Sequence, residues 1–290
     1  MKPELPKTRL ITMSSNHSET NIRNLALILP TLGQRGYSLP FDRNELSESS
    51  QIFVVLVCPK RAMGQMMEAD VKFDLIIHDE GKGLSGAILK AIQQLPEGID
   101  FFTWIADDDF VRLSGLRRMA RALEADLKAT LAYGDCNYLN EDGGLMFTNK
   151  LGGLIGKGVR HTPMFVSQPA TLYRLGPFLE LGQSWTKYKY AFDFDILLGL
   201  FAKGDALYLP ETVASYRWHK DAITVRKRWS SSFEAALIRG RHREGAAKLF
   251  DVFEPFLIVG NVVAGSGVSF LAKLLSLPSV KRVWPNTLRP

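Results

Sequence analysis

The first half of the chain alternates short, mostly apolar runs with segments of helical periodicity. Apolar runs at 25–30, 52–57, 73–77 and 101–106 predict strands. Between the last two, apolar residues recur at helical spacing from Leu84 to Leu95 and stop before Pro96, which predicts a helix. Ser114 is predicted to cap a second helix whose apolar face is Leu116, Met119, Ala120, Leu123 and Leu127. This alternation is typical of an α/β domain with a largely parallel sheet flanked by helices.

The second half of the chain is less regular. A glycine-rich stretch at 143–158 predicts a loop or an irregular hairpin, residues 196–201, preceded by 193–195, predict a helix ended by Gly204, and 207–209 predict a short strand closed by Pro210. The segment 255–277 is strongly apolar with Lys273 as its only charge, and its length approaches the ~20 residues of a membrane span. Glycines and polar residues interrupt it early, so it predicts one or two helices on a membrane surface or a partner. A helix that closes the core is the alternative.

Composition narrows the class of protein. A hydrophobic fraction of 46% with 23% charged residues is that of an ordinary soluble globular protein. Cys58 and Cys136 lie far apart and match no metal or redox spacing, which indicates a reducing compartment. The N-terminus lacks the apolar core of a signal peptide. These features predict a cytoplasmic protein of one large domain or two small ones.

Positive charge is concentrated in one part of the chain. Residues 217–248 carry nine basic and three acidic side chains, an excess that equals the net charge of +6 of the whole chain. Such a patch attracts nucleic acid, anionic lipid or a phosphorylated substrate. A solvated helix face is the alternative reading.

Three consecutive carboxylates, Asp107, Asp108 and Asp109, follow the strand predicted at 101–106. That strand has no polar face, as expected when both faces are buried, and ligands bind outside the carboxyl ends of strands in open α/β sheets. Adjacent acids repel one another, and a divalent cation such as Mg²⁺ or Mn²⁺ relieves that repulsion. The cluster therefore favours a metal site over a polar turn that caps the next helix.

Residues 81–86 match the pattern G-x-G-x-x-G between a predicted strand and a predicted helix. This is the context of a dinucleotide site, so a nicotinamide-dependent oxidoreductase is one hypothesis. Asp79 and Glu80 would repel a pyrophosphate there, and a ribose site needs one acid rather than three. Alternatively the loop lets its backbone and Lys82 approach a nucleotide, or the glycines serve turn geometry alone.

Two further groups carry candidate chemistry. Asp193 and Asp195 precede a predicted helix, where Asp193 is either an N-cap or a general base. The segment 215–220 gathers aromatic and cationic side chains around His219, which is either structural, a metal ligand or a diphosphate contact.

Taken in order, these segments resemble the family 2 glycosyltransferases of GT-A fold. The matching stretches are LALILPTLG at 25–33, DEGKGLSGA at 79–87, WIADDD at 104–109, QPATLYR at 168–174, AFDFD at 191–195 and YLPETVASYRWH at 208–219. The resemblance implies a Rossmann-like, mostly parallel sheet flanked by helices over residues 25–225. A polar lead-in at 1–24 would precede it, and a basic then apolar helical extension at 226–290 would follow it.

The resemblance also implies an activity. It predicts an inverting transfer of a sugar from a nucleotide-diphosphate donor, most simply a UDP-sugar, to a hydroxyl of a glycan or a lipid-linked acceptor. Asp193 matches the family's base. A divalent metal, Mn²⁺ or Mg²⁺, would be held by Asp107, Asp109 and His219. Nucleic acid is not expected as a partner, and the C-terminal region would hold the protein peripherally on the inner face of a membrane.

The resemblance assigns further contacts to single residues. Donor contacts fall on Pro30, Thr31, Lys82, Ser85 and Asp108, and the acceptor side falls on Gln168 and Asp195. Cys58-Pro59-Lys60 stands where many relatives carry acids that read the base. In one of two alignments Ala106 stands at the family's first acid, so the register of the acidic triplet stays open. A catalytically inactive sugar-binding protein of the same fold is a further alternative.

Overall fold

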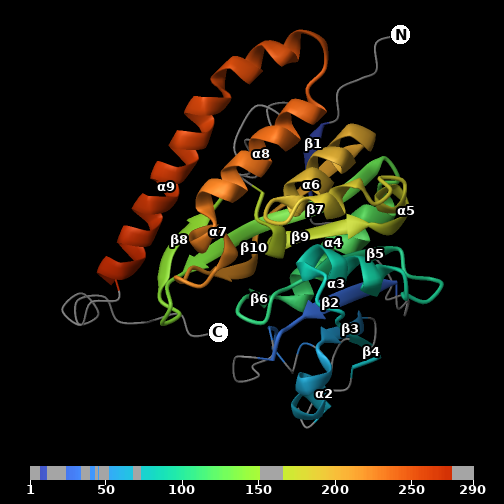
Figure 1. Cartoon of the computed structure of the whole chain (residues 1–290). Coiled ribbons are helices and arrows are strands. Elements are labelled where there is room, and N and C mark those ends of the chain that lie inside the picture. Colours follow the sequence, from blue (N-terminus) through green and yellow to red (C-terminus); the bar gives the residue numbers. More distant parts are fainter. Residues whose placement is uncertain are drawn as a thin grey trace.

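The computed structural model describes residues 7–11, 24–33, 40–42, 45, 52–67, 73–150 and 166–275, and their strands form one mixed sheet (Figure 1). The strands are β1 (Thr8–Leu10), β2 (Leu25–Pro30), β3 (Ile52–Cys58), β4 (Leu75–His78), β5 (Phe101–Trp104), β6 (Phe110–Val111), β7 (Ala129–Leu139), β8 (Leu145–Asn149), β9 (Thr171–Arg174) and β10 (Asp205–Arg217). Their order is β1-β10-β7-β9-β5-β2-β3-β4, with β6 beside β10 and β8 beside β7. Within the main row only β9 runs antiparallel to its neighbours, β5 and β7, so the predicted largely parallel sheet is confirmed.

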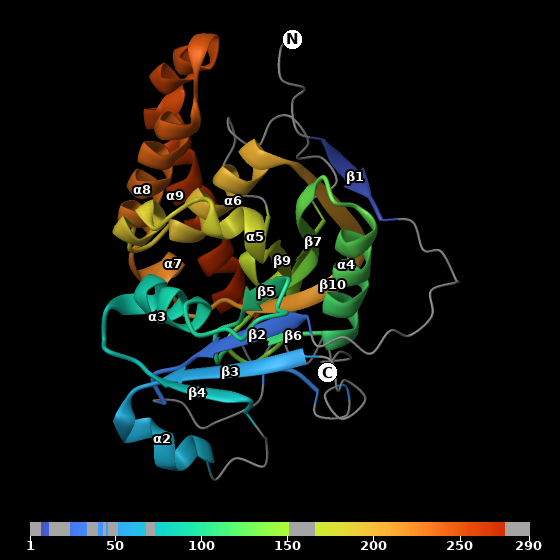
Figure 2. The ribbon, with the colours of Figure 1, turned by 90° about the vertical axis from the view of Figure 1, so that its right-hand side faces the viewer.

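Helices cover both faces of the sheet. They are α2 (Lys60–Met67), α3 (Gly83–Ile92), α4 (Leu113–Ala125), α5 (Leu175–Leu179), α6 (Phe192–Lys203), α7 (Ile223–Arg226), α8 (Arg228–His242) and α9 (Glu254–Leu275), with 3-10 turns η3 (Gln168–Ala170), η4 (Ser184–Lys187) and η5 (Gly245–Phe253). Figure 2 shows α3, α5 and α6 on one side of the sheet and α4 on the other. Each side has its own core: Ile88, Phe178 and Leu197 belong to one, Leu116 and Met119 to the other.

Strand β2 illustrates how the sequence forms a sheet with helices packed on both faces. Leu25, Leu27 and Leu29 point into the core beneath α4, while Ala26 and Ile28 point into the core beneath α3 and α6. Because side chains alternate between the faces of a strand, a central strand of a two-sided sheet must be apolar throughout. The strands predicted at 25–30, 52–57, 73–77 and 101–106 are confirmed, with end positions shifted by one or two residues.

Two predicted details of the first half are wrong. The second helix begins at Leu113, and Ser114 does not cap it. Instead the Glu45 carboxylate accepts hydrogen bonds from the Leu113 N–H at 2.6 Å and from the Ser114 hydroxyl at 2.7 Å, so an acid distant in sequence supplies the capping acceptor. Leu127 does not join the apolar face, because the helix ends at Ala125 and this side chain is exposed.

Strand β10 also differs from the prediction, which closed a short strand at Pro210. It continues to Arg217, because the register shifts between Leu209 and Thr212. A bulge of this kind accommodates proline, which has no N–H to give to a ladder. The stretch 143–158, predicted as a loop or an irregular hairpin, contains β8, which pairs antiparallel with β7, and 151–165 lie outside the described residues. The predicted C-terminal apolar segment forms the single helix α9 over its described part.

Gly204 ends α6 as predicted, and the structure gives the reason. Its φ of −174° is ordinary extended backbone, so conformational freedom is not what requires glycine. A Cβ atom at this position would lie 2.4 Å from the Lys128 carbonyl oxygen and 2.7 Å from Thr130 Cγ2. The chain therefore turns from α6 into β10 in direct contact with the start of β7.

We expect Gly204→Ala to destabilise the fold by about 1–3 kcal/mol, because the new methyl group overpacks against backbone. Gly176→Ala is the matched control, since no heavy atom lies within 4 Å of the position of its Cβ. That change should be neutral or stabilising by less than about 1 kcal/mol. Urea unfolding of both variants measures the difference. Equal effects would show that the contact at Gly204 relaxes without strain.

Candidate active site

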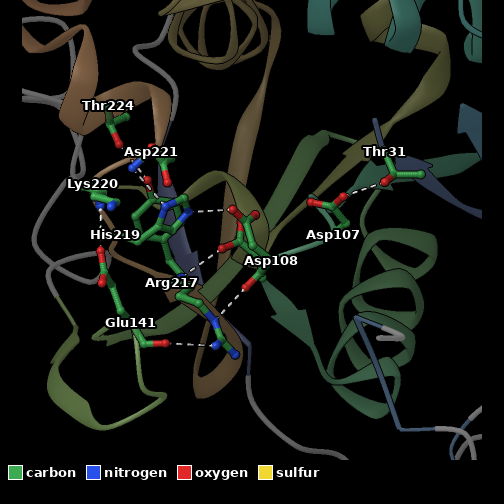
Figure 3. Close-up of polar contacts among 11 residues, drawn as sticks. Thr31, Asp107, Asp108, Glu141, Arg217, His219, Lys220, Asp221 and Thr224 are labelled. Atoms are coloured by element: carbon green, nitrogen blue, oxygen red, sulfur yellow. Dashed lines mark hydrogen bonds and ion pairs between the residues drawn. The ribbon is translucent and has the colours of Figure 1, made fainter. Parts of the chain in front are cut away.

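The order of strands reverses at β2, and the first candidate residues lie at this point. β3 and β4 lie on one side of β2, whereas β5, the next strand in sequence, lies on the other. Such a reversal opens a crevice at the carboxyl ends of the two strands, and ligands bind there. Thr31 follows Pro30 at the end of β2, and its hydroxyl donates a hydrogen bond of 2.5 Å to Asp107, which follows β5 (Figure 3). The strand reversal thus has at its carboxyl end the Asp107 carboxylate, which is positioned by the Thr31 hydroxyl.

Asp108 faces a different partner. Its Oδ2 lies 2.7 Å from His219 Nε2, and the ring is almost completely buried (Figure 3). The Asp221 N–H donates to His219 Nδ1 at 3.2 Å. Since Nδ1 accepts, the proton of a neutral ring is assigned to Nε2, from which it is shared with Asp108. The imidazole reaches this carboxylate because β10 ends two residues before it.

Asp109 points into the protein. Its Oδ1 accepts a hydrogen bond of 2.9 Å from the Arg217 N–H, at the end of β10. Burial raises the pKa of this carboxyl well above its usual range, and the negative charge of Asp108 raises it further. Asp109 therefore ties the turn after β5 to β10.

The three acids thus have three separate partners. Asp107 contacts Thr31, Asp108 contacts His219, and Asp109 contacts the backbone of β10. Among the residues that the structure describes, no group of three or more His, Cys, Asp or Glu side chains is arranged to hold a metal. The predicted set of Asp107, Asp109 and His219 is therefore not gathered as one ligand group. His219 lies instead beside Asp108, which the sequence assigned to the donor.

Arg217 stabilises this arrangement, although no role was predicted for it from the sequence. Its Nε donates to the Asp108 carbonyl oxygen at 3.2 Å, and its Nη1 donates to the Glu141 carbonyl oxygen at 3.3 Å. The Glu141 side chain accepts the Lys220 N–H at 3.1 Å. The loop between β7 and β8 therefore holds both sides of His219 (Figure 3). The only sequence signal was the cluster of aromatic and cationic residues around His219.

The glycine-rich turn follows β4, an edge strand of the sheet. Gly81 and Gly83 have φ of 74° and 82°, which favour glycine, and the Asp79 carboxylate accepts the Gly81 N–H. Exposed Lys82 pairs with Glu80 at 2.8 Å, and Ser85 is buried in the first turns of α3. A dinucleotide fingerprint belongs beside the strand reversal, whereas this turn lies two strands away from β2. Its position thus disfavours the oxidoreductase hypothesis.

Asp193 lies at the start of α6, on an aromatic cluster beneath the end of β5. The Trp104 ring stacks on Tyr173 and Phe192, with centroids 5.1 and 5.9 Å apart. The charge of Asp193 contributes to the raised pKa of the Tyr173 hydroxyl, after burial. Burial also raises the pKa of Asp193 itself to about 6. A carboxyl with such a pKa exchanges protons near neutral pH.

Gln168 lies at the same end of β5. Its amide nitrogen donates a hydrogen bond of 2.8 Å to the Trp104 carbonyl oxygen, so η3 is attached to the strand that leads into the acidic turn. Asp195 has other partners. It is almost completely buried and pairs with Arg241 at 2.7 Å and His242 at 2.8 Å, both on α8. Of the two residues predicted on the acceptor side, Gln168 bonds to β5, whereas Asp195 bonds to α8.

Glu234 of α8 organises the loop before Asp193, and sequence reasoning missed it. Its carboxylate accepts the backbone N–H groups of Lys189, Tyr190 and Ala191 at 3.1, 2.7 and 2.9 Å. These amides belong to the N-cap Ala191 and the two residues before it, so one side chain fixes the loop that leads into the helix carrying Asp193. Its charge also contributes to the raised pKa of Asp193. No local pattern marks such an acceptor, because it comes from more than forty residues away.

Solved structures share this architecture. TarS residues 1–349 of S. aureus, in complex with UDP, superpose with a TM-score of 0.55 at 13% identity over 82% of this chain and 70% of that one. The mannosyltransferase PcManGT of Pyrobaculum calidifontis, in complex with GDP-Man and Mn²⁺, gives 0.55 at 15% identity over 90% and 81%. The chain has the GT-A fold. No protein-family model matches the sequence, and no curated protein matches it as a relative.

We expect Glu234→Ala to loosen the loop before α6. Hydrogen exchange at the amides of 189–191 should accelerate by about tenfold or more, because each loses a charge-assisted hydrogen bond. The pKa of Asp193 should fall, because a neighbouring negative charge is removed. Exchange followed by mass spectrometry and carboxyl titration by NMR measure the two effects.

The control for this prediction is Glu180→Ala. Glu180 forms an exposed ion pair with Lys203 at the other end of α6, 2.7 Å long. An exposed pair contributes little, so this variant should leave exchange at 189–191 unchanged. Unaltered exchange in Glu234→Ala would mean that the loop is held by its packing alone.

Proposed function

We propose that the protein is a metal-dependent, inverting glycosyltransferase that uses a nucleotide-diphosphate sugar. The observation that carries the proposal is a pair of groups at one end of β5. One is the Asp108–His219 pair, and the other is Asp193, a carboxyl whose pKa is raised to about 6. The GT-A fold, seen in structures with UDP and with GDP-Man and Mn²⁺, supports this assignment. A sugar transfer needs both groups, because one site must hold the leaving diphosphate while another removes a proton from the acceptor.

The nucleoside would bind at the strand reversal. Asp107 already accepts a hydrogen bond from the Thr31 hydroxyl there. A ribose offers the same kind of donor, an O–H group, to the remaining lone pairs of this carboxylate. Lys82 and Ser85, predicted as donor contacts, lie on the turn after β4 and at the start of α3, two strands away from β2, and their roles stay predictions.

Asp108 and His219 fit a divalent cation. Mg²⁺ and Mn²⁺ accept carboxylate oxygens, Mn²⁺ also accepts imidazole nitrogen, and such ions commonly take only one or two protein ligands beside substrate phosphates and water. Two adjacent ligands of an octahedral ion lie about 3 Å apart, close to the 2.7 Å between Oδ2 and Nε2. To bind such an ion through Nε2, the neutral ring would carry its proton on Nδ1, and the contact of Nδ1 with the Asp221 N–H would be given up. A cation bound there would stabilise the charge that develops on the leaving diphosphate.

Asp193 would act as the base on the acceptor. Its carboxylate would take the proton of the acceptor hydroxyl while the oxygen forms a bond to the anomeric carbon of the donor sugar. The bond between that carbon and the diphosphate oxygen breaks on the opposite face, so the configuration inverts. Gln168, fixed to the Trp104 carbonyl, would help to orient the acceptor. The acceptor, glycan or lipid-linked, stays a prediction.

Substitutions in the acidic triplet test the donor half. Asp108→Asn should weaken Mn²⁺-dependent UDP binding by about tenfold or more, because a charged ligand is lost. Asp109→Asn should change it little, since the amide oxygen still accepts the Arg217 N–H. Isothermal titration with UDP, with and without Mn²⁺, measures both. If Asp109→Asn weakened Mn²⁺-dependent UDP binding more than Asp108→Asn did, Asp109 would be the metal ligand instead of Asp108.

The same titration separates the proposal from its alternatives. Wild-type protein that binds neither UDP nor GDP in the presence of Mn²⁺ would contradict it. Binding of NADH under the same conditions would favour an oxidoreductase. A protein that binds nucleotide sugars but catalyses neither transfer nor hydrolysis would be a sugar-binding protein of this fold.

Asp193 gives a second test through pH. The transfer rate should fall as pH drops through about 6, because a protonated carboxyl cannot accept the acceptor proton. Asp193→Asn should lower the rate by about 10²–10⁴-fold and leave UDP binding unchanged. A rate profile from about pH 3 to about pH 9 under saturating donor measures this. An acid limb near 4, typical of an exposed carboxylate, would rule out Asp193 as the base.

A further inference from the structure

The C-terminal helix α9 exposes a stripe of large apolar side chains. It lies on the outside of the molecule along α8 (Figures 1 and 2). The stripe consists of Phe256, Val259, Val263, Phe270 and Leu274, each between 41% and 75% exposed. These positions recur at helical spacing and share one face, whereas Ile258 and Ala272 lie on the opposite, buried face.

The exposed apolar surface extends to the elements before α9. Leu249, Phe250, Val252 and Phe253 of η5 are exposed, as are Trp229, Phe233 and Leu237 of α8. The three residues on α8 are spaced by four and form a second stripe, on the side opposite the fully buried Ile238. Apolar patches on this scale mark contacts with another apolar phase. The structure thus presents a helical hairpin, 228–275, with an apolar exterior.

Polar contacts hold α9 to the domain along its length. Glu254 pairs with Arg239, Asn261 donates to Ser232, and Ser269 accepts from Arg228 and Trp218. By length and composition the described stretch Ala247–Leu275 could cross a membrane. However, a helix that is bonded to the rest of the protein near both of its ends has one face in contact with protein. Only its outer face is available to lipid, which is the arrangement of a helix lying in a membrane interface.

Charge favours an anionic partner. Residues 226–275 carry eight basic and four acidic side chains, and 255–272 carry none of either sign. Exposed Lys248 and Lys273 stand on either side of this uncharged stretch. The acids Glu254 and Asp251 are already paired with Arg239 and Arg243. Two copies of this surface brought together would oppose like charges, whereas anionic headgroups complement them.

We propose that the α8–α9 hairpin docks on the surface of a bilayer that contains anionic lipid. The outer face of α9 and the tip formed by η5 lie among the acyl chains nearest the headgroups, and the flanking lysines contact phosphate. The domain stays outside the bilayer, attached to the hairpin through Trp218, which bonds Ser269 of α9, and through Glu234 and Arg241 of α8, which bond the start of α6 and the loop before it. This inference does not depend on the proposed catalytic activity, since it rests on the surface of the hairpin alone.

Vesicle flotation of the full chain tests the proposal. Wild-type protein should float with phosphatidylcholine vesicles that contain phosphatidylglycerol, and much less with phosphatidylcholine alone. The triple variant Phe256→Ser, Val263→Ser, Phe270→Ser should reduce the partition coefficient by about 100-fold or more, because it removes three apolar side chains that the bilayer would bury. Leu127→Ser is the matched control, because Leu127 is 84% exposed but lies after α4, and it should float like wild type.

A charge variant distinguishes docking from misfolding. Lys248→Gln with Lys273→Gln removes no apolar contact and should reduce partition onto phosphatidylglycerol vesicles by about tenfold. Wild-type protein that stays unbound to both vesicle types would overturn the proposal. A second outcome would also overturn it: wild-type protein is a dimer in light scattering, the triple variant is a monomer, and neither binds vesicles. In that case a second copy of the chain would cover the stripe.

Discussion

The hydrogen bond between the Arg217 N–H and the buried Asp109 carboxylate is the contact on which the donor side of the candidate site depends. It joins residues 108 positions apart. Because an unpaired buried carboxylate is costly, the turn after β5 and the end of β10 must stay together. Two residues beyond this bond lies His219, which thereby reaches Asp108. Asp109 therefore has a structural role, and that role allows Asp108 to contact the imidazole of His219.

A second constraint acts through α8. Its inner face contacts the start of α6 through Glu234, Arg241 and His242, while Ile238 fills the core. Its outer face carries exposed Trp229, Phe233 and Leu237. The same short helix thus positions the loop before Asp193 and forms part of the proposed membrane surface. Arg228 at its start connects it to α9 through Ser266 and Ser269, and Trp218, next to His219, bonds the same Ser269.

The sequence predicted those parts of the fold in which burial alone decides the residue type. The strands β2, β3 and β5 are apolar on both faces, and α3 has a clear helical period, so local pattern was sufficient. β7 and β9 escaped prediction because Thr, Tyr and Arg interrupt their runs, and β10 was cut short at a proline that a bulge accommodates. At the site, the pattern located the acidic turn, His219 and Asp193. It could not assign partners to the three acids, since hydrogen bonds to Thr31 and Arg217 arise only from sheet order. Glu45 and Glu234 act across the chain and leave no local signature.

Because α8 both positions the loop before Asp193 and forms part of the proposed membrane surface, its length can vary little. Each residue turns a helix by about 100°, so one residue inserted between Phe233 and Glu234 would rotate everything on one side of it by that angle. Glu234 or the apolar outer stripe would then face the wrong way, whichever end of the helix stayed fixed. Changes of three or four residues restore the facing, but they shift the helix by about a turn along its axis. Insertions and deletions among homologous chains should therefore fall outside 228–242, even where the side chains themselves differ.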